Sequence, residues 1–321
     1  MWATVRPVAQ ALVVGLFTLW VISVITFAMT SSRAKEATAI AALGQETATP
    51  ELIEEFIRQN NLDAPAPERY ARWLGRFVVG DWGQSVVTGR SIRDEIRPRL
   101  WNTLKLTALA LIVGIPLSIA IGVFVGARAG SKLDTEVTAA TVILAAVPEF
   151  ILGLLLILVF AVYIPIFPVD STALSFGTPS EKLLALVLPT VTLALHMLPY
   201  MTRMTRAAAR EAFGSAYVRA AVLRGLPRRR VVWIHGMKNA GVPLVNAIAL
   251  NLVWLLGGVI VVENLFAYPG IGQLLVFAID ANDALMVQAL AIIMGAMFVA
   301  VSIVADLVIV YLNPRLRSAH D

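Results

Sequence analysis

Residues 211–243 read EAFGSAYVRAAVLRGLPRRRVVWIHGMKNAGVP and lie between two long apolar segments. The stretch has a single acidic residue, Glu211. Its basic residues are Arg219, Arg224, Arg228, Arg229, Arg230 and Lys238. Lysine and arginine are retained on the cytoplasmic side of membrane proteins, so a loop this basic is expected to face the cytoplasm.

Two short helices separated by a glycine are predicted within this loop. Phe213, Tyr217 and Ala221 recur at every fourth position, which places them on one face of a helix. Gly225 can adopt the left-handed conformation that ends such a helix, and Pro227 suits the first turn of the next one. A merely solvated loop needs neither the apolar face nor the glycine, so we interpret the stretch as a helix, a glycine elbow and a second helix.

The composition of the whole chain indicates an integral membrane protein. Of its 321 residues, 58% are hydrophobic and 15% are charged, whereas soluble domains have about 25% charged residues. The chain has no cysteine and only three histidines, far apart, so neither disulfides nor a metal site is expected. We attribute the net charge of +5 mostly to arginines on the cytoplasmic side, where they fix the topology and attract the anionic inner leaflet. Nucleic-acid binding is not expected, because no basic stretch is interleaved with aromatic residues.

Six apolar stretches are long enough to cross a bilayer, which takes about 20 residues. They are 8–30, 103–127, 137–163, 183–202, 242–262 and 286–312. Basic residues gather between the second and third stretches, in 203–240 and after the sixth. This distribution predicts a multi-pass protein with both termini in the cytoplasm. The predicted fold is all-α, with six transmembrane helices.

This topology predicts four parts. They are the N-terminus and first transmembrane helix (1–30), an external segment (31–100), a transmembrane domain (101–312) that contains the loop 211–243, and a cytoplasmic tail (313–321). The external segment is long enough to be translocated whatever its charge. Its polar stretches 50–61 and 67–77 predict helices. Its few apolar residues predict a small cap and not an independent domain.

Prolines interrupt several of the predicted spans. Pro116 lies in the second, Pro148 in the third, and Pro189 and Pro199 in the fourth. A proline in a membrane helix leaves a carbonyl without its helical partner and bends the axis. We expect a bent bundle, which suits a protein that opens and closes.

A series of motifs along the chain resembles the permeases of ABC importers, most closely the B-type subunit of the oligopeptide/dipeptide/nickel branch. The loop contributes Tyr217-Val218-Arg219-Ala220-Ala221, Arg224-Gly225-Leu226, Lys238-Asn239-Ala240 and Pro243, which resemble the EAA loop. Further matches are Gly80-Asp81-Trp82-Gly83, Asn102-Thr103-Leu104, Glu263-Asn264-Leu265-Phe266, Pro269-Gly270-Ile271-Gly272, and Asp306 with Asn313-Pro314-Arg315-Leu316-Arg317. Ala220 and Arg224 depart from the usual threonine and lysine. The resemblance covers nearly the whole chain.

The resemblance implies one subunit of a type I importer in the plasma membrane of a prokaryote. Its partners would be a second, homologous permease, two ABC ATPase subunits and an extracytoplasmic substrate-binding protein. The EAA loop would be the coupling helix that docks on an ATPase. The coupling residues would be Phe213, Tyr217, Arg219, Ala220, Ala221, Arg224, Gly225 and Leu226. The chain has no Gly-x-x-x-x-Gly-Lys-Ser/Thr loop, so ATP and magnesium would bind to the partners and the chain itself would not be an enzyme.

Two ionisable residues inside predicted spans are candidates for the translocation pathway. A charge at membrane depth costs at least about 3 kcal/mol when unpaired, so such residues are rare and often functional. Glu149 either lines the pathway and meets a cationic group such as a peptide amino terminus, or holds helices together as a hydrogen-bonded carboxyl. His196 either lines the pore or bonds to another helix.

The function predicted is that of a permease forming half of the pathway for peptides or related small solutes. The alternative is a proton-coupled secondary transporter that uses Glu149 and His196 as a relay, which leaves the basic loop without a role. A membrane hydrolase is disfavoured, because the chain has neither His-Glu-x-x-His nor Gly-x-Ser-x-Gly.

Overall fold

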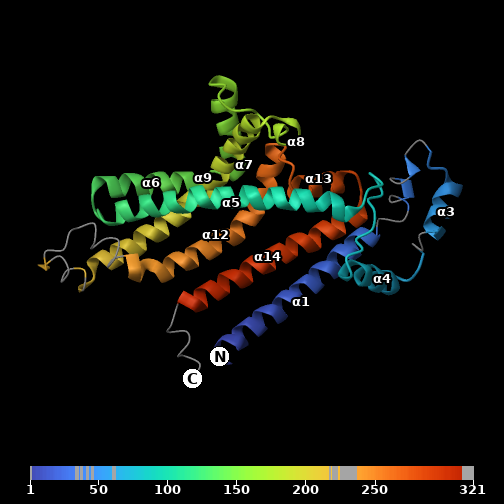
Figure 1. Ribbon diagram of the computed structural model, residues 1–321, viewed down its shortest axis with the longest axis horizontal. Helices are drawn as coiled ribbons and strands as arrows, with labels where there is room; N and C mark the ends of the chain where they lie inside the picture. Colours follow the sequence, from blue (N-terminus) through green and yellow to red (C-terminus); the bar gives the residue numbers. More distant parts are fainter. Residues whose placement is uncertain are drawn as a thin grey trace. The chain divides into compact units, whose positions relative to one another are not determined.

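The computed structural model describes residues 2–32, 36, 39–40, 43–44, 47–59, 63–216, 218, 223–224 and 237–312. These residues form helices and turns and contain no β-strand, apart from an isolated bridge between Gln84 and Ser91. The predicted all-α fold is therefore confirmed. Figure 1 shows the helices in chain order.

The chain divides into two compact units. The first comprises Met1–Val8, Leu104–Tyr268 and Val301–Asp321, and the second Ala9–Thr103 and Pro269–Ala300. Each unit combines segments that are far apart in the sequence, so the division differs from the four consecutive parts predicted from the sequence. The predicted external segment 31–100 shares the second unit with parts of the chain that lie before and after it.

The first unit is built around the long helix α9 (Pro179–Gly214). The unit also contains most of α5 (Ile92–Gly126), and then α6 (Lys132–Ala146), α7 (Glu149–Ile157), the π-helical turn η1 (Leu158–Tyr163), α8 (Ala173–Phe176) and α12 (Met237–Leu265). α9 packs against α12, α6, α7 and α8. It begins with a capping box between Thr178 and Glu181, which satisfies its first amide groups. Pro189 and Pro199 both lie inside this helix.

Glycines bring α5 and α9 close together. A Cβ atom added to Gly122 would lie 2.5 Å from Cβ of Thr205, and one added to Gly126 would lie 2.8 Å from Cβ of Ala209. Both distances are shorter than a normal carbon–carbon contact. Small residues allow this approach of helices in membranes, where packing replaces the hydrophobic effect between helices.

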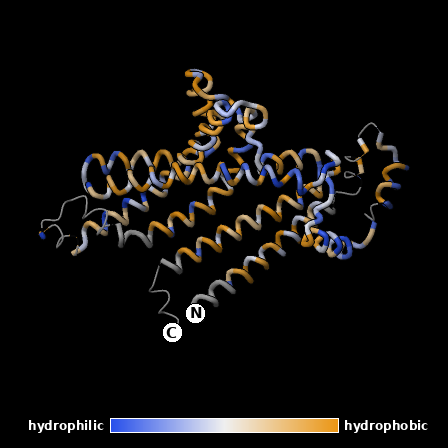
Figure 2. Tube along the Cα trace, viewed as in Figure 1, coloured by the Kyte–Doolittle hydropathy of each residue, from blue (hydrophilic) through white to orange (hydrophobic). Residues whose placement is uncertain are grey.

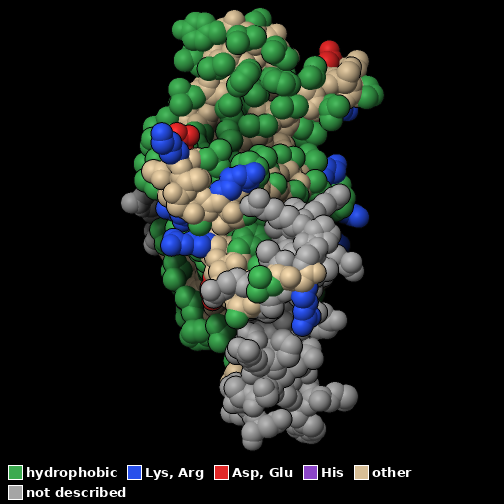
Figure 3. Space-filling view, turned by 90° about the vertical axis from the view of Figure 1, so that its left-hand side faces the viewer, with side chains coloured by type: hydrophobic (Ala, Val, Ile, Leu, Met, Phe, Trp, Pro, Cys, Tyr) green, Lys and Arg blue, Asp and Glu red, His purple; other side chains and the backbone are tan. Residues whose placement is uncertain are grey.

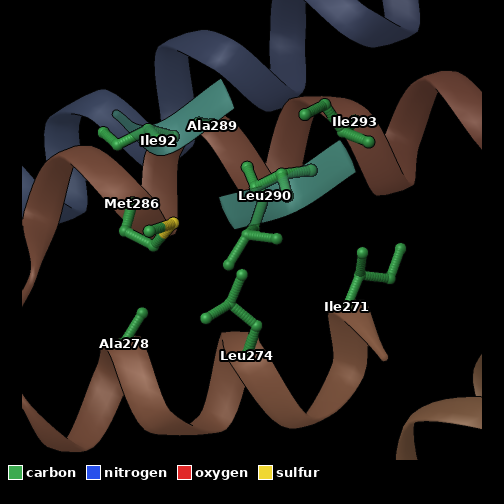
Figure 4. Packing of buried hydrophobic residues seen from close by; sticks show 9 residues of the cluster. Ile92, Ile271, Leu274, Ala278, Met286, Ala289, Leu290 and Ile293 are labelled. Atoms are coloured by element: carbon green, nitrogen blue, oxygen red, sulfur yellow. The ribbon is translucent and has the colours of Figure 1, made fainter. Parts of the chain in front are cut away.

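The second unit contains α1 (Trp2–Ser32) from Ala9 on, α3 (Pro50–Gln59), α4 (Ala66–Val78), the start of α5, α13 (Ile271–Asp280) and most of α14 (Ala284–Leu312). α3 and α4 confirm the helices predicted at 50–61 and 67–77. Figure 4 shows the core, where Ile92 of α5 meets Leu274 of α13 and Leu290 of α14.

Several of the family-like motifs meet in this unit. The amide nitrogen Nδ2 of Asn102 donates to the carbonyl of Pro269 at 2.9 Å. The backbone N–H of Ile271 donates to the hydroxyl of Thr103 at 3.0 Å, which caps the first turn of α13 from a distant helix. Trp82 stacks on Phe77 beside the same core. These motifs therefore hold the second unit together.

Five helices of the described chain are long and apolar enough to cross a membrane: Gln10–Thr30, Ile92–Gly126, Pro179–Gly214, Leu244–Leu265 and Ala284–Val308. Figure 2 shows their hydrophobic residues, in contrast to the hydrophilic α4. Two of these helices extend furthest beyond the predicted spans. α5 begins before residue 103, and α9 continues beyond 202.

The third predicted span, 137–163, is not one helix. α6 and α7 meet at an angle of 98°. The bend falls at Val147, whose backbone is extended, and Pro148. A residue before proline avoids the helical region and proline has no N–H to continue the helix, which explains the break. The number of spans reaches six only if this bent pair counts as one.

Candidate functional site

The structure brings the two predicted pathway residues together in the first unit. Nε2 of His196, on α9, lies 3.3 Å from Oε2 of Glu149, at the start of α7. The side chains are 28% and 22% exposed, so both remain reachable. Gly258 of α12 faces the carboxylate, and a Cβ atom there would lie 3.5 Å from Oε1 of Glu149. The site is therefore formed where α7, α9 and α12 meet.

The helix break positions the carboxylate. The sequence places Glu149 near the middle of the third predicted span, and the structure places it in the first turn of α7, directly after Pro148. A helix N-terminus carries a partial positive charge, which stabilises a carboxylate. Because of the bend, Glu149 is the first residue of a new helix and does not lie in the interior of a span.

The chemistry available to this pair is recognition by charge and hydrogen bonding. A carboxylate accepts hydrogen bonds from ammonium groups, and an imidazole both donates and accepts. Among the described residues no group of three or more histidine or acidic side chains could hold a metal ion. The pair therefore suits a polar or cationic solute.

A second ion pair, which sequence reasoning missed, joins α6 to α9. Arg206 donates from Nε to Oδ1 of Asp134 and from its NH2 group to Oδ2 at 2.8 Å. The N–H of Gly130 donates to the same carboxylate at 2.9 Å. Asp134 is buried, with a side chain 5% exposed. The pattern Ser131-x-x-Asp134 marks the start of α6, but nothing in the local sequence indicates the arginine partner.

The coupling residues are only partly described. Phe213 and Arg224 are described, and Arg224 is exposed. Tyr217, Arg219, Ala220, Ala221, Gly225 and Leu226 lie outside the described residues. Phe213 belongs to the last turn of α9, which ends at Gly214, and Ser215 is extended with ψ of 153°. The prediction that Phe213, Tyr217 and Ala221 line one face of a helix reaches outside the described residues and stays a prediction.

The motif after the fifth span ends α12. Glu263 and Phe266 are buried, and the N–H of Tyr268 donates to the carbonyl of Glu263 at 2.8 Å. Ala267 has φ of 47°, the left-handed geometry that commonly terminates a helix. Burial, together with the nearby charge of Glu263, raises the pKa of the Tyr268 phenol. The tyrosine therefore remains neutral.

Comparison with known proteins identifies the family. Residues 118–318 match the family described as binding-protein-dependent transport system inner membrane component. The chain belongs to this family. It is a permease and not an enzyme, and a multi-pass protein of the inner membrane.

Several relatives are similar over most of their length. The probable peptide ABC transporter permease protein y4tP of Sinorhizobium fredii is 30% identical, covering 86% of this chain and 88% of the relative. The oligopeptide transport system permease protein AppB of Bacillus subtilis is 33% identical, covering 82% and 84%. The glutathione transport system permease protein GsiC of Escherichia coli is 31% identical, covering 94% and 95%. The resemblance to the oligopeptide/dipeptide/nickel branch of ABC importer permeases is therefore confirmed.

Proposed function

We propose that the chain is the permease subunit of an ATP-driven importer for peptides or related small solutes, and that it forms half of the translocation pathway. The names of the relatives, which refer to peptide, oligopeptide and glutathione transport, support this substrate class. A second permease would form the other half. Two ATPase subunits would bind ATP and magnesium below it, and an external binding protein would deliver the solute to the segment 31–100. The termini would lie in the cytoplasm of a prokaryote.

The observation that carries this proposal is the continuity of α9. The helix holds His196 near its middle and ends at Gly214, where the basic loop begins. The part of α9 from His196 to Gly214 covers about 27 Å along the helix axis. α9 remains one helix over this stretch although Pro199 lies in it, so an ATPase that moves the loop would also move His196 relative to Glu149.

Two further features support a concerted movement. The Asp134–Arg206 ion pair ties α6 to the loop-proximal part of α9, so these helices would shift together. The bend at Val147 and Pro148 separates α6 from α7, and such a break allows one helix to reorient without the other. Alternating access would then open the Glu149–His196 pair to one side of the membrane at a time.

In this proposal the pair recognises the charged end of the solute. The carboxylate of Glu149 would accept hydrogen bonds from the ammonium group of a peptide, and charge-assisted hydrogen bonds of this kind are the strong ones. His196 would orient the carboxylate. The names of the relatives give no support to the alternative of a proton-coupled secondary transporter.

Reconstitution tests the proposal. The chain is purified with its neighbouring transport subunits and placed in liposomes, and peptide uptake is measured with ATP, without ATP, and with the permease alone in a proton gradient. We expect two ATPase chains to co-purify and uptake to require ATP. Uptake by the permease alone, driven by the proton gradient, would overturn the proposal in favour of the relay.

A further inference from the structure

An apolar groove on the first unit has no role in the proposed transport cycle. It lies along the hairpin of α5 and α6, has a volume of about 620 Å³, and has Leu198 of α9 among its lining residues. Its walls include Ile121 and Phe124 of α5 and Leu133 and Leu144 of α6.

The groove offers almost nothing to a polar ligand. Thr141 is the one lining residue with a polar side chain, and its hydroxyl already donates to the carbonyl of Thr138 at 2.8 Å. Phe124 and Leu133 are 49% and 37% exposed. A groove of this kind is suited to a hydrocarbon chain.

Two cations lie at one end of the groove, on the turn that joins α5 to α6. The guanidinium carbon of Arg128 lies 3.7 Å from the ring centre of Phe124, and its NH1 group donates to the carbonyl of the same residue. Lys132 directly precedes the lining residue Leu133 and is exposed. Figure 3, which views this end of the protein, shows lysine and arginine side chains among hydrophobic ones.

These two cations lack a carboxylate partner among the described residues. Asp134, the nearby buried acid, is occupied by Arg206 and by the N–H of Gly130. Glu136 lies one turn along α6 from Lys132 and is also exposed, and none of the ion pairs within the described part of the chain includes it. The end of the groove therefore has a local positive charge.

We propose that this groove binds an anionic phospholipid, with one acyl chain along α5 and α6 and the phosphate at Arg128 and Lys132. The lining residues from Leu133 to Leu144 cover about 17 Å of helix axis, close to half of a hydrocarbon core of about 30 Å. The groove thus has the depth of one leaflet. Basic residues at the cytoplasmic surface attract anionic lipids, and this assignment to the inner leaflet rests on the proposed topology.

The charge decides between a lipid and a helix of the second permease. An apolar helix in the groove would leave Arg128 and Lys132 without a counterion. An anionic headgroup supplies one negative charge that both cations can contact, while its acyl chain covers the apolar walls.

Native mass spectrometry of the delipidated importer complex tests the proposal, with phosphatidylglycerol and phosphatidylcholine as probes. Each basic residue near the surface contributes about fivefold to the binding of an anionic lipid. The double variant Arg128→Gln with Lys132→Gln should therefore weaken phosphatidylglycerol binding by about 30-fold and leave phosphatidylcholine binding unchanged. Lys182→Gln, which removes a cation elsewhere, should have no effect.

Filling the groove gives an independent test. Ala140 lines the groove and Ala139 does not, although both are exposed on α6. Ala140→Trp should abolish phosphatidylglycerol adducts, and Ala139→Trp should retain them. The proposal would be overturned if both lipids bound equally well and the charge variants did not change their binding. It would also be overturned if the wild-type complex carried no lipid adduct and the Ala140→Trp complex lost its second permease, because a helix would then occupy the groove. Neither outcome depends on transport activity.

Discussion

The ion pair between Asp134 and Arg206 should stabilise the first unit substantially, and substitution of Arg206 by methionine removes it. The carboxylate would lose two of its three hydrogen bonds and keep only the one from Gly130. Hydrogen bonds to charged groups contribute about 1.5–3 kcal/mol each, and breaking a buried ion pair costs about 3–5 kcal/mol. The Arg206 side chain is 24% exposed, which places the expected loss at the lower end, about 3 kcal/mol.

The assay is reversible denaturant unfolding of the purified permease in detergent, read as the free energy of unfolding. Arg203→Met is the matched control, because Arg203 is exposed one turn earlier on α9. It should change the free energy by no more than about 0.5 kcal/mol. The double variant Asp134→Leu with Arg206→Met should lose much less than the sum of the two single variants, since it leaves no buried charge without a partner. An Arg206→Met variant as stable as wild type, or strictly additive losses, would refute this reasoning.

Three further predictions concern the transport cycle and the packing of α5. Gly225→Val should abolish substrate-stimulated ATP hydrolysis in the reconstituted complex while leaving membrane insertion intact, because valine tolerates poorly the left-handed conformation that the sequence predicts for this residue; hydrolysis at the wild-type level would show that the elbow is not the coupling point. Glu149→Gln should raise KM about tenfold for peptides with a free amino terminus, as expected for loss of one charged hydrogen bond, and leave N-acetylated peptides unaffected; an equal change for both would exclude recognition of the ammonium group. Gly122→Ala should destabilise the protein by about 1–3 kcal/mol through the contact with Thr205, whereas Gly257→Ala, where the added Cβ meets nothing within 4 Å, should leave the free energy of unfolding unchanged. Equal stability of the two variants would contradict close packing of α5 on α9.

Pro148 bends the third predicted span. The proline was expected to bend the third span, and the bend is confirmed, because proline acts through its own missing N–H and its clash with the preceding residue. The angle of 98° and the position of Glu149 in a new first turn were not expected. The position of Glu149 follows from the break itself, because Glu149 is the first residue after Pro148, whereas the angle accompanies the packing of α7 against α9 and α12.

The basic loop begins later along the chain than its sequence pattern indicates. The glycine and proline punctuation was read as a helix that begins near Glu211, but α9 reaches Gly214 without interruption and ends at an extended Ser215. Periodicity alone does not distinguish the end of a long helix from the start of a short one. The coupling role of residues 211–243 stays a prediction.

The class of this protein can be predicted from its amino-acid sequence, because apolar length, the distribution of arginine and lysine, and the ordered motifs all indicate a helical permease. These signals are local, because the bilayer imposes the same requirement on every spanning segment. Which distant residues contact one another depends on how the helices pack. Asp134 finds Arg206, Glu149 finds His196, and Asn102 finds the carbonyl of Pro269 across long stretches of chain. The physical reason is that these contacts follow from the close packing of whole helices, to which residues far from either partner contribute.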